Sequence, residues 1–588
     1  MIDRRRLLLN VSACLAIAVG LLLAGGCVRL LPSSWFERPV ETFADAIARI
    51  DREIDRVARR LDLPGLTFVV FDEQQILWRR DSGWADIESK ITVDEETIFR
   101  AGSISKVFTA IEIMRLHEER LLDLDAPIEA VLPDFAVQRP FDDASPIAVR
   151  SLLTHRSGLP RNGTLPLWYW DPGPAVLREL VASLAAGYAS YPPWTRYKYS
   201  NIGYCLLGRV IEVLRGRGFP EQMERAIFDP LGMTSSAFLS SRLPRGRTVA
   251  TGYWPIGSEN VASHAYDIIT MPSGNLYATS SDLARFGQCI LRQGLIEEER
   301  LLAPETLAEM FDARYATKHD PQSNGLGWMT DSLFLGERVV FHDGTNDGTI
   351  SMLALLPERH LGLVAIANSD AFEDAVVELA FEALGWLRQG LFGVNRRPAQ
   401  EEPSFQIAPD ALAAYAATYV VNGEPLRIRL DDGRLTADVL GIPVRLVPIS
   451  ATRFRAHHPL LPLNDVLLTI SPEPSKDAIV TLGGSYYIYA PRYPVQASLP
   501  EDWQPLLGVY EVHPRHASRY SDADVLWRTE IVFVQGMLSV DGSKQLAPID
   551  ARRIRIVGGI FDEEIMDRDP ETGIIEWASF RYVPEAAP

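Results

Sequence analysis

Apolar and polar positions follow two different periods along this chain. Residues 41–62 carry apolar side chains at helical spacing, and the mainly apolar segment at 66–71 is typical of a buried strand. Helical spacing returns at 103–121. Three apolar runs and a last helical pattern complete this part, at 339–341, 351–356, 362–367 and 372–388. Helices between two sets of strands predict an α/β (α+β) domain over residues 41–390, in which helices flank a largely antiparallel sheet.

After this domain the period changes to two. Residues 391–407 are rich in Pro and charged residues and predict a linker, and the alternating stretches beyond it are separated by Gly and Asp turns. Residues 446–455 recur as residues 546–555 with six of ten positions identical. The repeat predicts two all-β modules, at 408–496 and 497–588. Each is long enough for a small lipocalin-like barrel, which leaves no strand edge exposed.

The first residues have the anatomy of an export signal. Three Arg at positions 4–6 precede an apolar run, which ends in Leu-Ala-Gly-Gly before Cys27. This ending resembles a bacterial lipobox, so we expect a signal peptide at 1–26, a lipidated Cys27 and a linker at 27–40. A plain cleaved signal and an uncleaved anchor are the alternatives. Each version exports the protein, and the lipobox predicts a membrane-anchored lipoprotein of the cell envelope that faces the periplasm or the cell exterior.

Charge and cysteine content exclude several classes of protein. The formal net charge of −19 argues against a nucleic-acid partner, because neutralising phosphates needs a basic face. Only Cys205 and Cys289 remain outside the signal region, and both lie in apolar helical patterns, so we expect buried free thiols. That number excludes a disulfide framework and a Cys-rich zinc site. We expect neither a metal ion nor a cofactor.

The first candidate for chemistry is Ser103-Ile-Ser-Lys106, at the start of the predicted helix 103–121. A Ser and a Lys one turn apart share a helix face. A Ser hydroxyl needs an adjacent base to become a nucleophile, and a buried Lys can lose its proton whereas an Arg cannot. Only six of the 58 basic residues are Lys, so a Lys at this position is informative. The alternative to a catalytic role is a structural one, in which the Ser caps the helix and the Lys lies on the surface.

Two further motifs carry suitable groups. Tyr199-Ser200-Asn201 offers a phenol that can relay protons and an amide that can hold a carbonyl group. His342-Asp343-Gly344-Thr345 follows the predicted strand 339–341, and its Gly allows a substrate backbone to lie close to the strand edge. The Thr345 and Ser103 amides together would make an oxyanion hole. When each of these two motifs is considered alone, aromatic packing of the first and a structural His in the second are equally good explanations.

The order and spacing of the three motifs resemble the penicillin-binding-protein-like serine hydrolases. That family includes class C β-lactamases, D,D-carboxypeptidases, D-aminopeptidases and related esterases, and Ser-x-x-Lys is a signature of the wider superfamily. The likeness covers about residues 45–390. It extends to Leu152–Pro160, Pro272–Phe286 and Gly325–Trp328. It implies a serine β-lactamase-like catalytic domain.

The resemblance also implies roles for individual residues. Ser103 would be the acylated nucleophile, Lys106 and Tyr199 would share the proton transfers, and Asn201 would bind the substrate amide. His342, Gly344 and Thr345 would line the substrate. His342 stands where β-lactamases carry a Lys, and a His is neutral for much of the time near pH 7. This difference favours the peptidase and D-aminopeptidase branches.

We therefore expect an acyl-enzyme hydrolase of small peptide, amide or ester substrates in the cell envelope. A β-lactamase is the first alternative, and a non-catalytic envelope binding protein is the second. D-Aminopeptidases of this family also carry two β-barrels after the catalytic domain, one of which reaches toward the active site. We expect the two β-modules here to restrict access to the cleft or to mediate assembly. The sequence leaves the oligomeric state open.

Overall fold

An eight-stranded antiparallel sheet forms the centre of the first domain. The computed structural model describes residues 40–584 with interior gaps, the longest of which are 313–322, 395–404, 491–500 and 515–526. In sheet order the strands are β12 (Ser323–Asn324), β13 (Met329–Asp331), β14 (Val339–Asn346), β15 (Thr349–Leu356), β16 (Leu361–Ala367), β1 (Gly65–Asp72), β2 (Ile76–Asp86) and β3 (Ile91–Thr92). Strands from both ends of the domain therefore meet in one sheet, where β1 pairs with β16.

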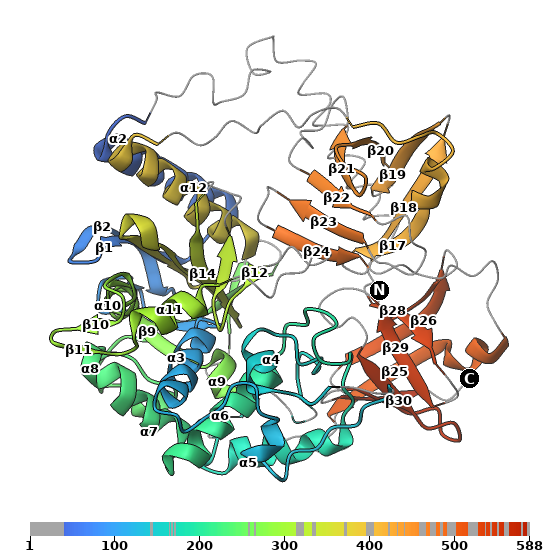
Figure 1. Ribbon diagram of the computed structural model, residues 1–588, viewed down its shortest axis with the longest axis horizontal. Helices are drawn as coiled ribbons and strands as arrows, with labels where there is room; N and C mark the ends of the chain where they lie inside the picture. Colours follow the sequence, from blue (N-terminus) through green and yellow to red (C-terminus); the bar gives the residue numbers. More distant parts are fainter. Residues whose placement is uncertain are drawn as a thin grey trace.

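Helices cover both faces of this sheet, as Figure 1 shows. Strand β1 explains why: Val69 and Phe71 face one hydrophobic core, whereas Phe68 and Val70 face a second core on the opposite side. The second core contains α2 (Phe43–Leu61) and α12 (Glu373–Phe392). The first core contains α3 (Ser105–Glu118), α4 (Val149–Leu153), α5 (Val176–Ser183), α6 (Asn201–Arg215), α7 (Phe219–Met223), α9 (Met271–Gly274), α10 (Ser280–Leu291) and α11 (Pro304–Met310). A strand with both faces buried is expected to be largely apolar, and in residues 66–71 only Thr67 is polar; its hydroxyl donates to Asp81 Oδ1 at 2.6 Å.

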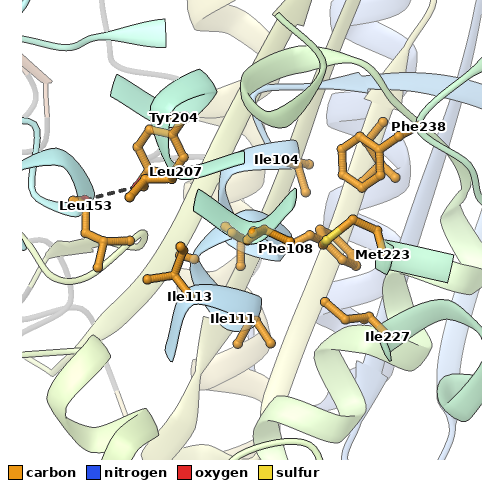
Figure 2. Packing of buried hydrophobic residues seen from close by; sticks show 14 of the residues in the cluster. Ile104, Phe108, Ile111, Ile113, Leu153, Tyr204, Leu207, Met223, Ile227 and Phe238 are labelled. Carbon is orange, nitrogen blue, oxygen red and sulfur yellow. Dashed lines mark hydrogen bonds between the residues drawn. The ribbon is translucent and has the colours of Figure 1, made fainter. Parts of the chain in front are cut away.

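Helix α3 lies deep inside the first core. Most of its residues are buried, and Phe108 stacks on Phe286 with the ring centroids 4.2 Å apart. Figure 2 shows Ile104, Phe108 and neighbouring side chains of α3 packed among residues of other helices. Closely packed side chains leave such a helix little freedom to move. The helix is therefore a rigid support for groups at its N-terminus.

A small second sheet leads into α3. Strand β4 (Ile98–Gly102) pairs with β9 (Leu276–Thr279), and the chain passes from β4 directly to Ser103. Gly102 has a positive φ of 50°, and a Cβ there would lie 2.9 Å from the Thr345 nitrogen of β14. Glycine thus lets the start of α3 approach the main sheet closely.

The predicted fold class of this domain is confirmed, with two local differences. Strand β14 pairs with β15 over Val340–Asn346, so the motif at His342–Thr345 lies inside the strand and not after it. Helix α12 continues to Phe392, beyond the expected domain end at residue 390. Apolar runs alone underestimated both elements, because β14 ends in polar residues and Arg388-Gln389-Gly390 interrupts the apolar pattern before the end of α12.

The two C-terminal modules differ in closure. In the second module, β25 (Gly508–Pro514) pairs with both β26 (Trp527–Val534) and β32 (Phe580–Pro584), which closes an eight-stranded barrel. The remaining strands of this barrel are β27 (Met537–Val540), β28 (Lys544–Pro548), β29 (Arg553–Val557), β30 (Ile565–Arg568) and β31 (Ile575–Trp577).

The first module is an eight-stranded sheet from β17 to β24 whose end strands do not pair within the described residues, so it is a half-barrel. Its strands are β17 (Ala417–Val421), β18 (Glu424–Asp431), β19 (Arg434–Val439), β20 (Ile442–Pro448), β21 (Arg453–His457), β22 (Val466–Thr469), β23 (Ala478–Leu482) and β24 (Tyr486–Ala490). Both predicted all-β modules are therefore present; alternation predicts their strands, whereas closure depends on strand tilt and stagger.

The sequence repeat corresponds to the same hairpin in each module. Residues 446–455 span the turn between β20 and β21, and residues 546–555 span the turn between β28 and β29. In both turns an Ile amide donates to an Arg carbonyl oxygen at 2.8 Å, from Ile449 to Arg453 and from Ile549 to Arg553. The identical positions thus preserve one turn geometry.

Both cysteines of the described residues are free and buried, as expected. Burial raises the pKa of each thiol to about 12, so neither is a ready nucleophile near neutral pH. The signal, Cys27 and the linker at 27–40 up to residue 39 lie outside the described residues. Within the described part of the chain, no helix has both the length and the apolar character needed to cross a bilayer.

Candidate active site

Ser103 and Lys106 lie against each other at the N-terminus of α3. The Lys106 Nζ atom donates to Ser103 Oγ at 3.0 Å, and Ser103 is partly exposed while Lys106 is fully buried. The other serine of the motif has a different position. Ser105 Oγ donates to the Gly102 carbonyl oxygen at 2.6 Å and accepts from the Leu276 amide at 2.9 Å. Ser105 therefore ties β4, α3 and β9 together, and Ser103 is the serine next to a base.

Lys106 has two more acceptors. Its Nζ donates to Asn201 Oδ1 at 2.9 Å and to the Ser273 carbonyl oxygen at 2.7 Å, so three acceptors match the three hydrogens of an ammonium group. Burial nevertheless holds the pKa of Lys106 well below its ordinary value, and the nearby Arg161 charge lowers this pKa further. A neutral amine that remains hydrogen-bonded in place is a suitable base.

Tyr199 lies between three charged or titratable groups. The Lys106 Nζ atom is 4.6 Å from its ring centroid, and the Arg161 guanidinium is 5.0 Å from it. The His155 ring stacks on the same phenol with centroids 4.4 Å apart. Cations over an aromatic face are stabilised by its negative charge density. These contacts fix the Tyr199 ring beside Lys106.

His155 supports this arrangement and is not placed as a base. Its Nδ1 accepts a hydrogen bond from the Ser200 amide at 3.0 Å, and the side chain is 3% exposed. Burial lowers the pKa of His155 well below its ordinary value, so the ring is neutral. We infer that His155 packs against Tyr199 and orients its ring.

Asn201 bridges Lys106 to a loop. Its Oδ1 accepts from Lys106, and its Nδ2 donates to Asn162 Oδ1 at 2.9 Å. The Asn201 amide also donates to the Arg161 carbonyl oxygen at 2.8 Å. Ser200, as the N-cap of α6, accepts from the Gly203 amide, which explains why Tyr199-Ser-Asn ends an extended segment and begins a helix. Asn201 is thus held by Lys106 on one side and by the loop at Arg161 and Asn162 on the other.

Strand β14 presents His342 and Gly344 toward the start of α3. Alternation along the strand puts both residues on the same face, and both are buried. A Cβ on Gly344 would lie 2.9 Å from the Ser103 nitrogen, and one on Gly102 would lie 2.9 Å from the Thr345 nitrogen. The two amides proposed for an oxyanion hole therefore belong to closely apposed backbones.

The imidazole of His342 is 2% exposed, and its ring centroid is 6.5 Å from that of Tyr199. Its Nδ1 lies 2.6 Å from the Asp343 carbonyl oxygen. Burial is the main cause that lowers the pKa of His342, to about 3. The group at this position is consequently a neutral ring and not a cation.

Sequence reasoning missed several residues that complete the site. Arg161 and Asn162 follow directly after the Leu152–Pro160 motif, but their types alone indicated nothing. Ser273 acts through its backbone carbonyl group, for which a sequence has no signal. Lys198 was detectable, since it is another of the six lysines and precedes Tyr199.

Comparison with known proteins matches this chain to a described family. The family model named Beta-lactamase matches residues 50–385, which is 336 of the 588 residues. Penicillin-binding protein 4 of Amycolatopsis lactamdurans is 27% identical over 386 residues, which cover 64% of this chain and 98% of that protein. Unguisins hydrolase ungD' of Aspergillus campestris is 28% identical over 53% of this chain, and the match spans 59% of its own length.

One solved structure is similar over a larger share of the chain. The crystal structure of SurE has a TM-score of 0.54 and 25% sequence identity, and covers 76% of this chain and 99% of that one. This share exceeds the part matched by the family model, so the similarity continues beyond the first domain.

The buried His342 makes stability depend on pH. Its pKa is about 3 in the folded chain and near 6.5 when unfolded, so between these values the unfolded state binds more protons and acidification destabilises the fold. We expect His342→Gln to reduce the slope of unfolding free energy between about pH 4 and 6, by up to about 1.4 kcal/mol per pH unit. Urea unfolding at a series of pH values measures this slope.

The control is His360→Gln, because the His360 side chain is half exposed. An equal slope in the His342→Gln variant and the wild type would contradict the buried, neutral state of His342.

Proposed function

The chain belongs to the β-lactamase and penicillin-binding-protein family of serine hydrolases, and we propose that it cleaves small peptide, amide or ester substrates through an acyl-enzyme on Ser103. The observation that carries this proposal is the 3.0 Å contact between Ser103 Oγ and a buried Lys106 whose pKa is lowered. A binding protein has no need of an activated nucleophile.

Acylation begins with proton transfer from Ser103 to the neutral Lys106 amine. The Ser103 Oγ atom then forms a bond to the substrate carbonyl carbon, and the carbonyl electron pair moves onto oxygen. The Ser103 and Thr345 amides would donate hydrogen bonds to this oxyanion, from the closely apposed backbones of α3 and β14. Because the base is the neutral amine, this step needs a pH above the lowered pKa of Lys106.

Collapse of the tetrahedral intermediate breaks the bond to the leaving group. The proton held by Lys106 passes to the leaving nitrogen or oxygen with the help of the Tyr199 hydroxyl, whose ring lies beside Lys106. Asn201 would hold the substrate amide, since its own side chain is fixed by Lys106 and Asn162. Water then attacks the acyl-enzyme by the same proton path, giving a carboxylic acid and free Ser103.

The neutral His342 supports peptide, amide or ester substrates over β-lactams. A β-lactam carries a carboxylate that a fixed cation would pair with, and a neutral imidazole supplies no such charge. A β-lactamase is the second candidate, and the description of the matching family model favours it.

We also propose that the protein is a lipoprotein of the cell envelope. The support is the sequence alone: a basic start, an apolar run and Leu-Ala-Gly-Gly before Cys27. Two or three acyl chains on Cys27 would anchor the protein stably, whereas one chain would not.

Lys106→Arg tests the proton transfer. The variant keeps the positive charge but cannot give up its proton, so turnover should fall by about 10²–10⁴-fold, close to the loss in Ser103→Ala. Initial rates on p-nitrophenyl esters, with intact-mass detection of the Ser103 adduct, provide the measurement. Full activity in Lys106→Arg would mean that another group deprotonates Ser103.

A substrate panel separates the candidates. Purified protein is assayed against p-nitrophenyl esters, D-amino-acid anilides and nitrocefin, with Ser103→Ala as the blank. We expect esters or anilides to be turned over faster than nitrocefin. Faster nitrocefin hydrolysis would select the β-lactamase, and a lack of turnover on every substrate would select a non-catalytic envelope binding protein.

Replacement of Cys27 tests the anchor. We expect Cys27→Ser to abolish lipid attachment and to release the protein from the membrane fraction, because the acyl chains need the thiol. Mass spectrometry of the N-terminal peptide and membrane fractionation measure both effects. A Cys27→Ser protein that is still cut at the same bond and still membrane-bound would refute the proposal.

A further inference from the structure

One buried carboxylate of the second β-module contacts two segments of the active site. Glu564 lies just before β30 and is 5% exposed. Its Oε1 accepts a hydrogen bond from the Arg161 backbone amide at 2.8 Å and lies 3.4 Å from Lys198 Nζ. Its Oε2 accepts from the Trp577 indole at 3.2 Å, so Glu564 is also held within its own module.

The ion pair between Glu564 and Lys198 is buried on both sides. Each side chain is 5% exposed, although the two residues lie in different domains. A buried carboxylate or ammonium group that loses its partner is strongly unfavourable. Undocking of the second β-module would therefore remove a buried counter-charge from Lys198.

The two segments that Glu564 contacts are those that position Tyr199 and Asn201. Arg161 accepts the Asn201 amide hydrogen bond with its carbonyl group and places its guanidinium over the Tyr199 ring. Lys198 precedes Tyr199, and its backbone amide donates to the His155 carbonyl oxygen at 2.7 Å. A displacement of either segment would move a group that contacts Lys106.

We propose that Glu564 is a positioning residue of the active site, and that the second β-module completes this site. Glu564 touches no reacting atom; it acts through Arg161 and Lys198 on Asn201 and Tyr199. This inference rests on the proposed function and deepens it. It also gives the second module a more direct part than restricting access or mediating assembly.

A different contact across the same interface provides a control. The Tyr188 hydroxyl donates to Asp567 Oδ1 at 2.9 Å, so this hydrogen bond joins the first domain to the second β-module without involving Glu564. Tyr188→Phe removes this interdomain hydrogen bond and leaves Glu564 in place. It thus separates docking in general from the action of Glu564.

The test uses the full chain with Glu564→Ala, Glu564→Gln, Lys198→Met, the double variant Glu564→Gln/Lys198→Met, and Tyr188→Phe. The second-order rate of Ser103 labelling by a fluorophosphonate reports positioning, because a misplacement of about 1 Å can cost about 10²-fold. Steady-state kinetics on a p-nitrophenyl ester give kcat and KM separately. Circular dichroism confirms that each variant is folded.

We expect Glu564→Ala to lower the labelling rate about tenfold or more, and to lower kcat while KM stays within about twofold. Glu564→Gln keeps an acceptor for the Arg161 amide but removes the buried negative charge beside Lys198, so the labelling rate of this variant also falls. The double variant removes both charges and should recover to within about threefold of the wild type. Tyr188→Phe should stay within about twofold of the wild type.

Three results would overturn the inference: wild-type labelling in Glu564→Ala, a double variant as slow as Glu564→Gln, or an equal loss in Tyr188→Phe. Hydrogen exchange gives a readout that needs no catalysis. Peptides covering 158–163 and 198–204 should exchange faster in Glu564→Ala and not in Tyr188→Phe. If Ser103 of the wild type is not labelled but exchange of these peptides is faster in Glu564→Ala, the proposed function fails and the positioning by Glu564 stands. If exchange of these peptides is unchanged in Glu564→Ala, the positioning by Glu564 is refuted.

Discussion

The burial of the Lys106 amine is the constraint on which the site depends. Desolvation favours the neutral form, and three acceptors around Nζ keep the group in place. These two effects oppose each other, since the acceptors favour the ammonium form. Because desolvation is the larger effect, the pKa of Lys106 is lowered while its amine stays fixed, whereas an exposed Lys would be protonated and mobile. The surrounding residues can be understood by what they supply to this one nitrogen.

The hydrophobic core is what makes that burial possible. Ile104 and Phe108, which flank Lys106 in the sequence, pack in the first core (Figure 2), and Lys106 at the start of α3 is itself fully buried. Glycines at positions 102 and 344 then allow β4 and β14 to approach Ser103 closely. The site thus uses a rigid helix for its nucleophile and base, and backbone amides for the expected oxyanion.

Periodicity and side-chain chemistry predicted much of this arrangement. Apolar spacing identified the helices and strands of the first domain, and the scarcity of Lys drew attention to Lys106. The sequence could not reveal Arg161 or the Ser273 carbonyl group, because their contribution comes from loop geometry and from the backbone. It could not reveal Glu564 either, which is more than 350 residues from its contacts along the chain. Strand alternation likewise left the closure of the first module undetermined.

The ion pair between Glu564 and Lys198 also constrains how the second module docks. An apolar contact tolerates sliding, because many arrangements bury a similar area, whereas a buried charge must meet its partner at one place. Glu564 is fixed in addition by the Arg161 amide and the Trp577 indole, which leaves little room for another orientation. A single carboxylate can therefore transmit the position of a whole β-barrel to Tyr199 and Asn201. The Glu564 carboxylate contributes more to the geometry of the interface than to the strength of the interface.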